Sequence, residues 1–248
     1  MAGKRHQRME ETRAHALREA VTLFLTQGYN NTTVNQIADR IDRSPAALLR
    51  AYPDKEAILF ALVTHMFGSQ FKNVRKLLGE KADPLLVYGV ETSLQIHICE
   101  LSEPLRDLYV SAYTLPTTTE LIYHNTAKEL QNIFAEYLPE ATESDFYELE
   151  LASGSVMRGY MAKPCDMYFT IERKLTLFLQ CALKIYDVPA DKRNAIVRQV
   201  LSMNLQDYAK SIVADTVKLS ETGFDSSILN AVLNYKSPSK GGTENEGT

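Results

Sequence analysis

The segment from Thr33 to Lys55, TVNQIADRIDRSPAALLRAYPDK, constrains the fold more than any other part of the chain. Thr33 is placed to cap a helix, and Gln36 follows three residues later, as a capping box requires. The residues that follow form one apolar face at helical spacing: Val34, Ile37, Ala38 and Ile41. This pattern predicts a short amphipathic helix that begins at Thr33.

A second short helix is predicted after a tight turn. Ser44 can cap it, and Pro45 occupies the first helical position, where its missing N–H costs nothing. The dipeptide Tyr52-Pro53 ends it, because the residue before proline disfavours helix, and Asp54 can cap the next helix. Helix, turn and helix match the arrangement that places a recognition helix in the major groove of DNA. Helix pairs of this kind also occur in all-α domains that do not bind DNA.

Residues 12–67 resemble the N-terminal domain of TetR-type transcriptional regulators. The matching residues are Leu17, Ala20, Val21, Phe24, Gly28, Tyr29, Thr33, Ile37, Ala38, Ser44, Leu48, Tyr52, Lys55 and Glu56. The resemblance implies a three-helix DNA-binding domain joined by a long helix to a larger helical domain. It also implies a homodimer that binds a palindromic operator and responds to a small-molecule effector, most often as a repressor.

The turn, Ile41-Asp42-Arg43 in place of Ala-Gly-Val, and two positions of the recognition helix depart from the family pattern. Asp42 stands where the family has Gly in the turn, although Asp tolerates the left-handed conformation better than most residues. Leu49 and Ala51 replace residues of the recognition helix, and neither can donate a hydrogen bond. A second hypothesis follows, in which the chain is a helical ligand-binding or protein-interaction module that has lost specific DNA binding.

The charge distribution favours contact with phosphate in the N-terminal part only. The net charge is −4, but residues 1–55 contain nine Lys or Arg against six acids, a net charge of +3, which leaves −7 for the remainder. The residues expected to contact DNA are either exposed side chains of the helix-turn-helix motif or residues that cap its helices. They are Thr33, Arg43, Ser44, Pro45, Ala46, Ala47, Arg50 and Lys55.

The sequence predicts an all-α fold with three parts. Residues 1–55 form the DNA-binding domain, with its motif at about 33–52; residues 56–236 form a regulatory and dimerisation domain; residues 237–248 form a disordered tail. Continuous helices are expected over 55–78 and 189–219. Strand and hairpin signals are weak throughout.

Several tyrosine, histidine and glutamine residues lie on otherwise apolar predicted helices. Because a ligand pocket combines apolar walls with a few directional polar groups, these residues predict an effector site. Each could equally be a core or boundary residue with a satisfied polar tip. The set is Tyr88, Gln95, His97, Tyr109, Tyr113, Tyr123 and His124.

Two helices, about 144–162 and 168–186, are predicted to form a four-helix bundle with a second subunit. The alternative is a core stripe within one subunit, which periodicity cannot separate from an interface. The residues predicted at the interface are Phe146, Leu149, Val156, Tyr160, Ile171, Leu175, Phe178 and Ala182.

No catalytic, cofactor or metal signature is found. The cysteines at 99, 165 and 181 lack the CxxC spacing of a zinc site and are odd in number. No segment approaches the roughly 20 apolar residues of a membrane span. We therefore expect a cytoplasmic protein that is not an enzyme.

Overall fold

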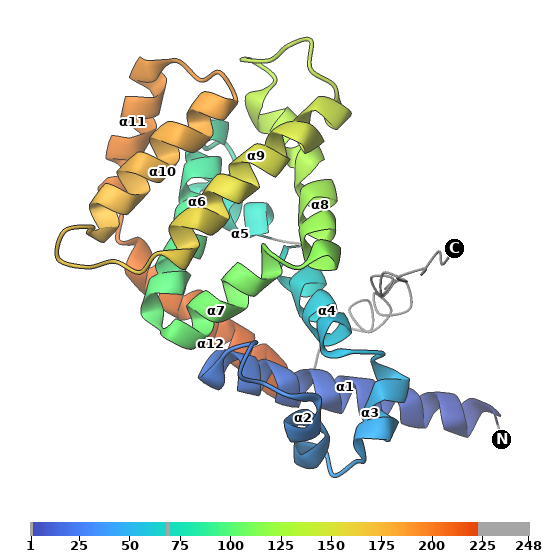
Figure 1. Ribbon diagram of the computed structural model, residues 1–248. Coiled ribbons are helices and arrows are strands. Elements are labelled where there is room, and N and C mark those ends of the chain that lie inside the picture. The colour runs from blue at the N-terminus through green and yellow to red at the C-terminus, as the bar shows by residue number, and fades with distance from the viewer. Residues whose placement is uncertain (1, 68–69, 223–248) are drawn as a thin grey trace, which may run out of the picture.

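The computed structural model describes residues 2–67 and 70–222, and every regular element in these ranges is an α-helix. The first three helices form the unit called the head below (Figure 1). They are α1 (Ala2–Gln27), α2 (Val34–Arg40) and α3 (Pro45–Ala51). The remaining helices form the body: α4 (Lys55–Phe67), α5 (Gln70–Leu78), α6 (Pro84–Leu101), α7 (Glu103–Ala112), α8 (Pro116–Phe134), α9 (Glu143–Ala162), α10 (Ile171–Ile185), α11 (Ala190–Leu201) and α12 (Leu205–Thr222). The predicted all-α class and the predicted order of head and larger helical body are confirmed.

The head is held together by the apolar face of α1. Leu17, Val21 and Phe24 are fully buried and pack with Ile37 of α2 and Leu48 of α3. These residues recur at helical spacing, so one continuous apolar stripe on α1 serves both shorter helices. The short helices, of seven residues each, depend on this packing because isolated helices of that length are unstable in water.

The body is built around α6, which contacts α5, α7, α8, α9, α10, α11 and α12. Its residues are buried along nearly the whole length, and the buried set includes the polar side chains of Glu91, Thr92, Ser93 and Gln95. The head rests on the body where α1 packs against α7 and α12 (Figure 1). The C-terminal helix α12 therefore contacts both the centre of the body and the first helix of the head.

Two predicted continuous helices are each described as two shorter ones. The segment predicted over 55–78 is described as α4 and α5, and residues 68–69 between them lie outside the described residues. The segment predicted over 189–219 breaks after Leu201, where the N–H of Ser202 donates to the carbonyls of Arg198 and Gln199, at 3.1 Å each. The prediction of a tail at 237–248 lies outside the described residues.

None of the helices in the described ranges has the length and apolar content needed to cross a lipid bilayer.

Candidate nucleic-acid interface and effector cavity

The two helices of the motif are fixed by the caps that the sequence predicts. The side-chain oxygen of Thr33 accepts the N–H of Gln36 at 3.2 Å, and the Gln36 side chain accepts the N–H of Thr33 at 2.8 Å. Ser44 accepts the N–H of Ala47 at 3.2 Å, and Asp54 accepts the N–H of Ala57 at 2.7 Å. These bonds satisfy backbone donors that a helix start leaves without a partner.

The turn between α2 and α3 adopts a left-handed conformation at Asp42, whose φ is +52°. Asp accepts this region at lower cost than most residues, so the chain forms the turn without the Gly of the family pattern. Arg43 then donates through its side-chain Nη1 to the carbonyl of Asp42 at 2.8 Å. The guanidinium remains exposed at the head surface next to the start of α3.

The surface of α3 is small, apolar and flanked by cations. Pro45, Ala46 and Arg50 are exposed, Ala47 is half-buried, and Leu48 is buried in the head. Leu49, which the sequence reasoning did not place in the site, is 42% exposed on the same short helix. An exposed leucine here can pack against a thymine methyl or a sugar but cannot bond a phosphate.

Lys55 does not present its ammonium group to the head surface, which corrects its prediction as a phosphate contact. Nζ donates to the carbonyls of Tyr29 at 2.7 Å and Thr32 at 2.8 Å, and it lies 4.1 Å from the centre of the Tyr29 ring. Burial lowers the pKa of this lysine. The side chain therefore holds the connection between α1 and α2 in place.

A basic groove of about 280 Å³ runs along α1 beside the turn. Arg8, Arg18 and Arg43 line it together with His15 and the single acid Glu11. Sequence reasoning missed Arg18 and His15 because their position on a long helix gives no sign of which side faces the turn. The groove has the positive charge to receive a phosphate chain.

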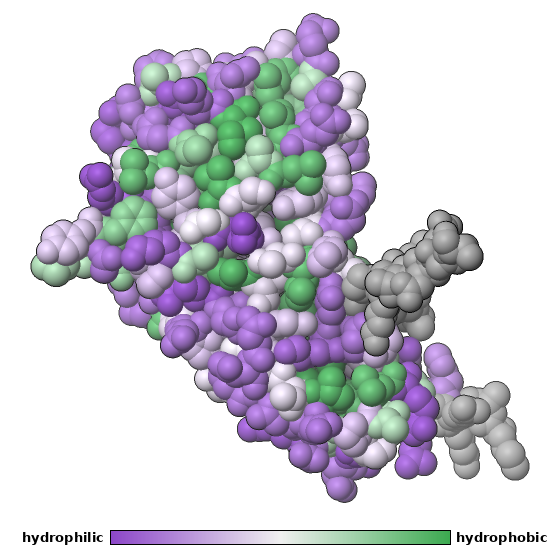
Figure 2. Space-filling model, viewed as in Figure 1, coloured by the Kyte–Doolittle hydropathy of each residue, from purple (hydrophilic) through white to green (hydrophobic). Residues whose placement is uncertain are grey.

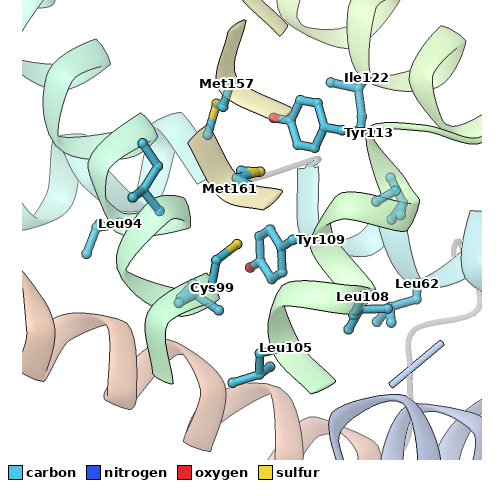
Figure 3. Packing of buried hydrophobic residues seen from close by; sticks show 14 of the residues in the cluster. Leu62, Leu94, Cys99, Leu105, Leu108, Tyr109, Tyr113, Ile122, Met157 and Met161 are labelled. Carbon is cyan, nitrogen blue, oxygen red and sulfur yellow. The ribbon is translucent and has the colours of Figure 1, made fainter. Parts of the chain in front are cut away.

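A cavity of about 320 Å³, called the large cavity below, lies in the body between α4, α5, α6, α7 and α12. Of the predicted effector residues, Gln95 and Tyr109 line it. A neighbouring small cavity of about 20 Å³ is lined by Tyr88, Gln95 and Tyr113. Figure 3 shows Tyr109 and Tyr113 with their hydroxyl groups turned towards α6.

A buried polar chain joins the two cavities. The Tyr113 hydroxyl donates to Gln95 Oε1 at 3.1 Å, and Gln95 Nε2 donates to Glu91 Oε1 at 2.5 Å. Burial raises the pKa of Glu91 to about 8. The sequence signal that could have marked Glu91 is an acid in the middle of α6, since the other acid of this helix, Glu100, lies in its last turn.

A second buried acid, Glu150 of α9, lines the small cavity. Its Oε2 accepts the hydroxyl of Tyr186 at 3.1 Å and also the hydroxyl of Ser153. Burial raises the pKa of Glu150 to about 7, while these hydroxyl donors oppose the shift. The carboxyl group of Glu150 therefore already has hydrogen-bond donors, the hydroxyl groups of Ser153 and Tyr186.

Three predicted effector residues do not line either cavity. His124 is exposed and pairs with Glu120 at 2.9 Å. Tyr123 packs edge-on against Tyr147, with ring centres 6.3 Å apart. His97 is half-buried on α6, where burial lowers its pKa. Their grouping with the others in the sequence reflects shared residue type and not shared position.

The predicted subunit interface divides into two groups. Phe146, Leu175, Phe178 and Ala182 are buried within the subunit, which corrects their prediction as contacts with a second subunit. The physical reason is that α10 packs against α6, α9 and α11 of its own chain, so its repeating apolar stripe faces inward. Leu149, Val156, Tyr160 and Ile171 are half-buried against this core.

The outer side of α9 and α10 carries a different apolar surface. Leu151 is 42% and Leu177 is 39% exposed, and the small residues Ala152, Ser155 and Gly159 lie exposed along α9. Figure 2 shows apolar residues gathered on the face of the body over these helices. Leu151 and Leu177 were not among the residues predicted at the interface, although they lie on the two helices predicted to form it.

Three comparisons with known proteins agree on the head. Residues 16–62 match the model of bacterial regulatory proteins of the tetR family. The HTH-type transcriptional regulator TcmR of Streptomyces glaucescens is 41% identical over 56 residues, which span 23% of this chain and 25% of TcmR. YuxN of Bacillus subtilis (strain 168), an uncharacterized HTH-type transcriptional regulator, is 23% identical over 198 residues, 79% of this chain and 64% of YuxN. The matches thus span less than two thirds of either relative.

The fold of most of the chain is similar to that of RolR in its crystal structure with the ligand resorcinol. The TM-score is 0.62 at 16% identity, and the alignment covers 77% of this chain and 95% of RolR. Capped helices, a left-handed turn and an exposed α3 define the head as a helix-turn-helix domain of the DNA-binding class. Residues 16–62 thus form a helix-turn-helix domain of the tetR family of bacterial regulatory proteins.

Proposed function

We propose that the chain is a cytoplasmic, ligand-responsive repressor that binds a palindromic operator as a homodimer. The observation that carries the proposal is the position of α12, which lines the large cavity and packs against α1 of the head. A ligand in that cavity contacts a helix that also touches the DNA-binding domain. The proposal assigns no catalytic step to the chain.

The contacts with DNA follow from what the head exposes. Arg43 and Arg50, with Arg8 and Arg18 of the basic groove, are assigned to phosphates, which fix position but carry no sequence information. Pro45, Ala46 and Leu49 are assigned to base edges. Since these side chains have no hydrogen-bonding group, we expect sequence choice through thymine methyl groups and DNA shape.

The response to ligand is assigned to a shift of the head relative to the body. Tyr208, Ile212 and Asp215 of α12 line the large cavity opposite α5 and α6. We assign two positions to α12, one in which the head fits DNA and one in which it does not. A ligand that binds more tightly to the second state shifts the equilibrium towards it, by the difference between its affinities for the two states. RolR, which shares this fold, was solved with a small aromatic ligand, and this supports a ligand role for the cavity.

The homodimer is assigned to the exposed face of α9 and α10 that contains Leu151 and Leu177. Two-fold symmetry follows from the palindromic operator, because each head reads one half-site. The half-buried residues of the original prediction border this face, so they can contribute at its edge.

Selection of random duplex DNA on the purified protein at physiological salt tests the function. We expect enrichment of a two-fold symmetric sequence with half-sites about one helical turn apart. Failure to enrich any sequence, together with retained binding of small molecules, would favour the second candidate, a helical ligand-binding or protein-interaction module. Leu49 and Asp42 motivate that candidate because they replace residues of the family pattern.

A further inference from the structure

The wall of the large cavity contains one buried carboxyl group. Glu91 of α6 is 4% exposed and lines both the large and the small cavity. Among the described residues, the hydrogen bond that its carboxyl group accepts comes from Gln95 Nε2, at 2.5 Å. A carboxylate has room for about four such bonds, so most of the capacity of Glu91 remains available on the cavity side.

The described residues around Glu91 provide no permanent cation. Among the described residues that line the two cavities there is no Lys and no Arg, and the histidine is His65 of α4, in the large cavity. The other acids nearby are Glu150, in the small cavity, and Asp215 of α12, in the large cavity. A buried carboxylate without a cation is costly, which makes this position unusual for a residue that serves only the fold.

The rest of the large cavity suits an apolar molecule with an aromatic or alkyl body. Leu94 and Ile98 lie on α6 beside Glu91, Val74 and Leu77 come from α5, and Tyr109 comes from α7. The faces of tyrosine rings attract cations as well as other rings. The lining therefore combines a large apolar area with one buried carboxyl group.

We propose that the large cavity binds an organic cation, an amine with an aromatic or alkyl body, with Glu91 as its counter-ion. This inference rests on the ligand-responsive part of the proposed function and names the class of effector. An organic anion would meet Glu91, Glu150 and Asp215, against which the described lining offers no Lys or Arg and, as a base, the imidazole of His65. A neutral alcohol would gain a hydrogen bond to Glu91 but no charge pair.

The proton balance of Glu91 is consistent with this assignment. In the empty cavity, burial raises the pKa of Glu91 to about 8 because the charged form is poorly solvated. An ammonium group beside it favours the charged form. The cation thus supplies the interaction that the protein itself does not provide.

Isothermal titration calorimetry of the full chain with three compounds of one skeleton tests the inference. The compounds are 4-phenylbutylamine, 4-phenylbutan-1-ol and 4-phenylbutanoate, which carry a positive, zero and negative charge. We expect the amine to bind at least tenfold more tightly than the alcohol, and the carboxylate to bind more weakly than both. In Glu91→Gln, we expect the advantage of the amine over the alcohol to fall at least tenfold while the alcohol binds as before.

Two further variants locate the charge. Glu148→Gln removes an exposed acid of α9 outside the cavity lining and should leave the preference for the amine unchanged. Asp215→Asn tests the acid on α12, and a loss of preference there in place of Glu91→Gln would overturn the assignment to Glu91. Thermal unfolding of Glu91→Gln shows whether it is folded, and Glu91→Asp, which keeps the charge, should retain part of the preference.

Equal binding of amine and alcohol, or no amine binding at millimolar concentration, would overturn the inference. These titrations contain no DNA, so their failure differs from failure of the proposed function. A protein that selects an operator but does not prefer the amine would remain a regulator with an effector of another class.

Discussion

The carboxylate of Asp107 on α7 accepts the backbone N–H of Asn30 at 2.8 Å, and it accepts the Asn30 side-chain amide through its other oxygen. Asn30 lies just after α1, so these bonds join the head to the body. A Cβ on Gly28 would lie 2.6 Å from the Asp107 Oδ2 atom. Gly28, Asn30 and Asp107 therefore form one close contact between the two parts of the molecule.

Gly28→Ala should destabilise the protein more than Gly79→Ala. Both glycines have positive φ, +89° and +95°, and so share the cost of a left-handed alanine. Only Gly28 adds a steric clash, since nothing lies within 4 Å of a Cβ at Gly79. We expect an excess loss of about 1–3 kcal/mol in urea denaturation, the usual cost of overpacking.

A double-mutant cycle tests whether the contact between Gly28 and Asp107 causes this excess loss. In the Asp107→Ala background the clashing carboxylate is gone, so Gly28→Ala and Gly79→Ala should cost similar amounts. An excess that persists without Asp107 would mean that the contact is not the cause.

Lys55→Ala and Arg50→Ala should separate stability from DNA contact. Lys55 donates to two carbonyls inside the head, so its removal should lower the free energy of unfolding by about 1–3 kcal/mol. Arg50 is exposed on α3, so its removal should weaken operator binding by about 1–3 kcal/mol and reduce the salt slope by about one.

Denaturation and salt-dependent binding measured on both variants check this prediction. Arg40→Ala is the matched control, because Arg40 is exposed on α2 but pairs with Glu19 at 3.0 Å. If Lys55→Ala changed the salt dependence of operator binding and left the free energy of unfolding unchanged, Lys55 would be a phosphate contact after all.

Stability should fall as pH rises from about 5 to about 8. The folded-state pKa values of Glu91 and Glu150, about 8 and about 7, lie above the ordinary value of 4.5. In this window the folded chain binds more protons than the unfolded chain, so the free energy of unfolding decreases with pH, by at most about 1.4 kcal/mol per pH unit for each group. The contribution is fully present below about pH 4.5.

Glu91→Gln isolates this effect, because its amide does not titrate. Urea denaturation at about pH 5.5 and pH 7.5 should show a smaller loss in the variant than in the natural chain. Equal losses would show that Glu91 is not protonated in the folded state at the lower pH. The comparison also cancels His97, whose lowered pKa acts in the opposite direction.

Leu151→Glu and Leu177→Glu should each dissociate the dimer without unfolding the subunit. Both side chains are about two-fifths exposed, so a charge there leaves the core intact but opposes burial against a second copy. Analytical ultracentrifugation measures the outcome. Leu201→Glu, on α11 at 38% exposure, is the control and should remain dimeric. Unchanged association of both Leu151→Glu and Leu177→Glu would move the interface elsewhere.

Rules that use only neighbouring residues were sufficient to predict where the short helices of the head begin. Thr33, Gln36, Ser44 and Pro45 determine where α2 and α3 begin, because caps act through bonds to residues two or three positions away. The left-handed turn at Asp42 was likewise accessible from residue type.

Only the tertiary structure decided which side chains are buried within the chain and which are available to a partner. Lys55 resembles a phosphate contact in sequence, but it folds back onto the carbonyls of Tyr29 and Thr32. The stripe of α10 suits either an interface or a core, and only its packing against α6, α9 and α11 makes it core. Periodicity reports that a helix face is apolar but does not report which chain covers it. The sequence by itself determined the helices, their caps and the helix-turn-helix class. The cavity, the buried Glu91 and the Asn30–Asp107 contact arise between residues far apart in the chain, so they depend on how the helices pack.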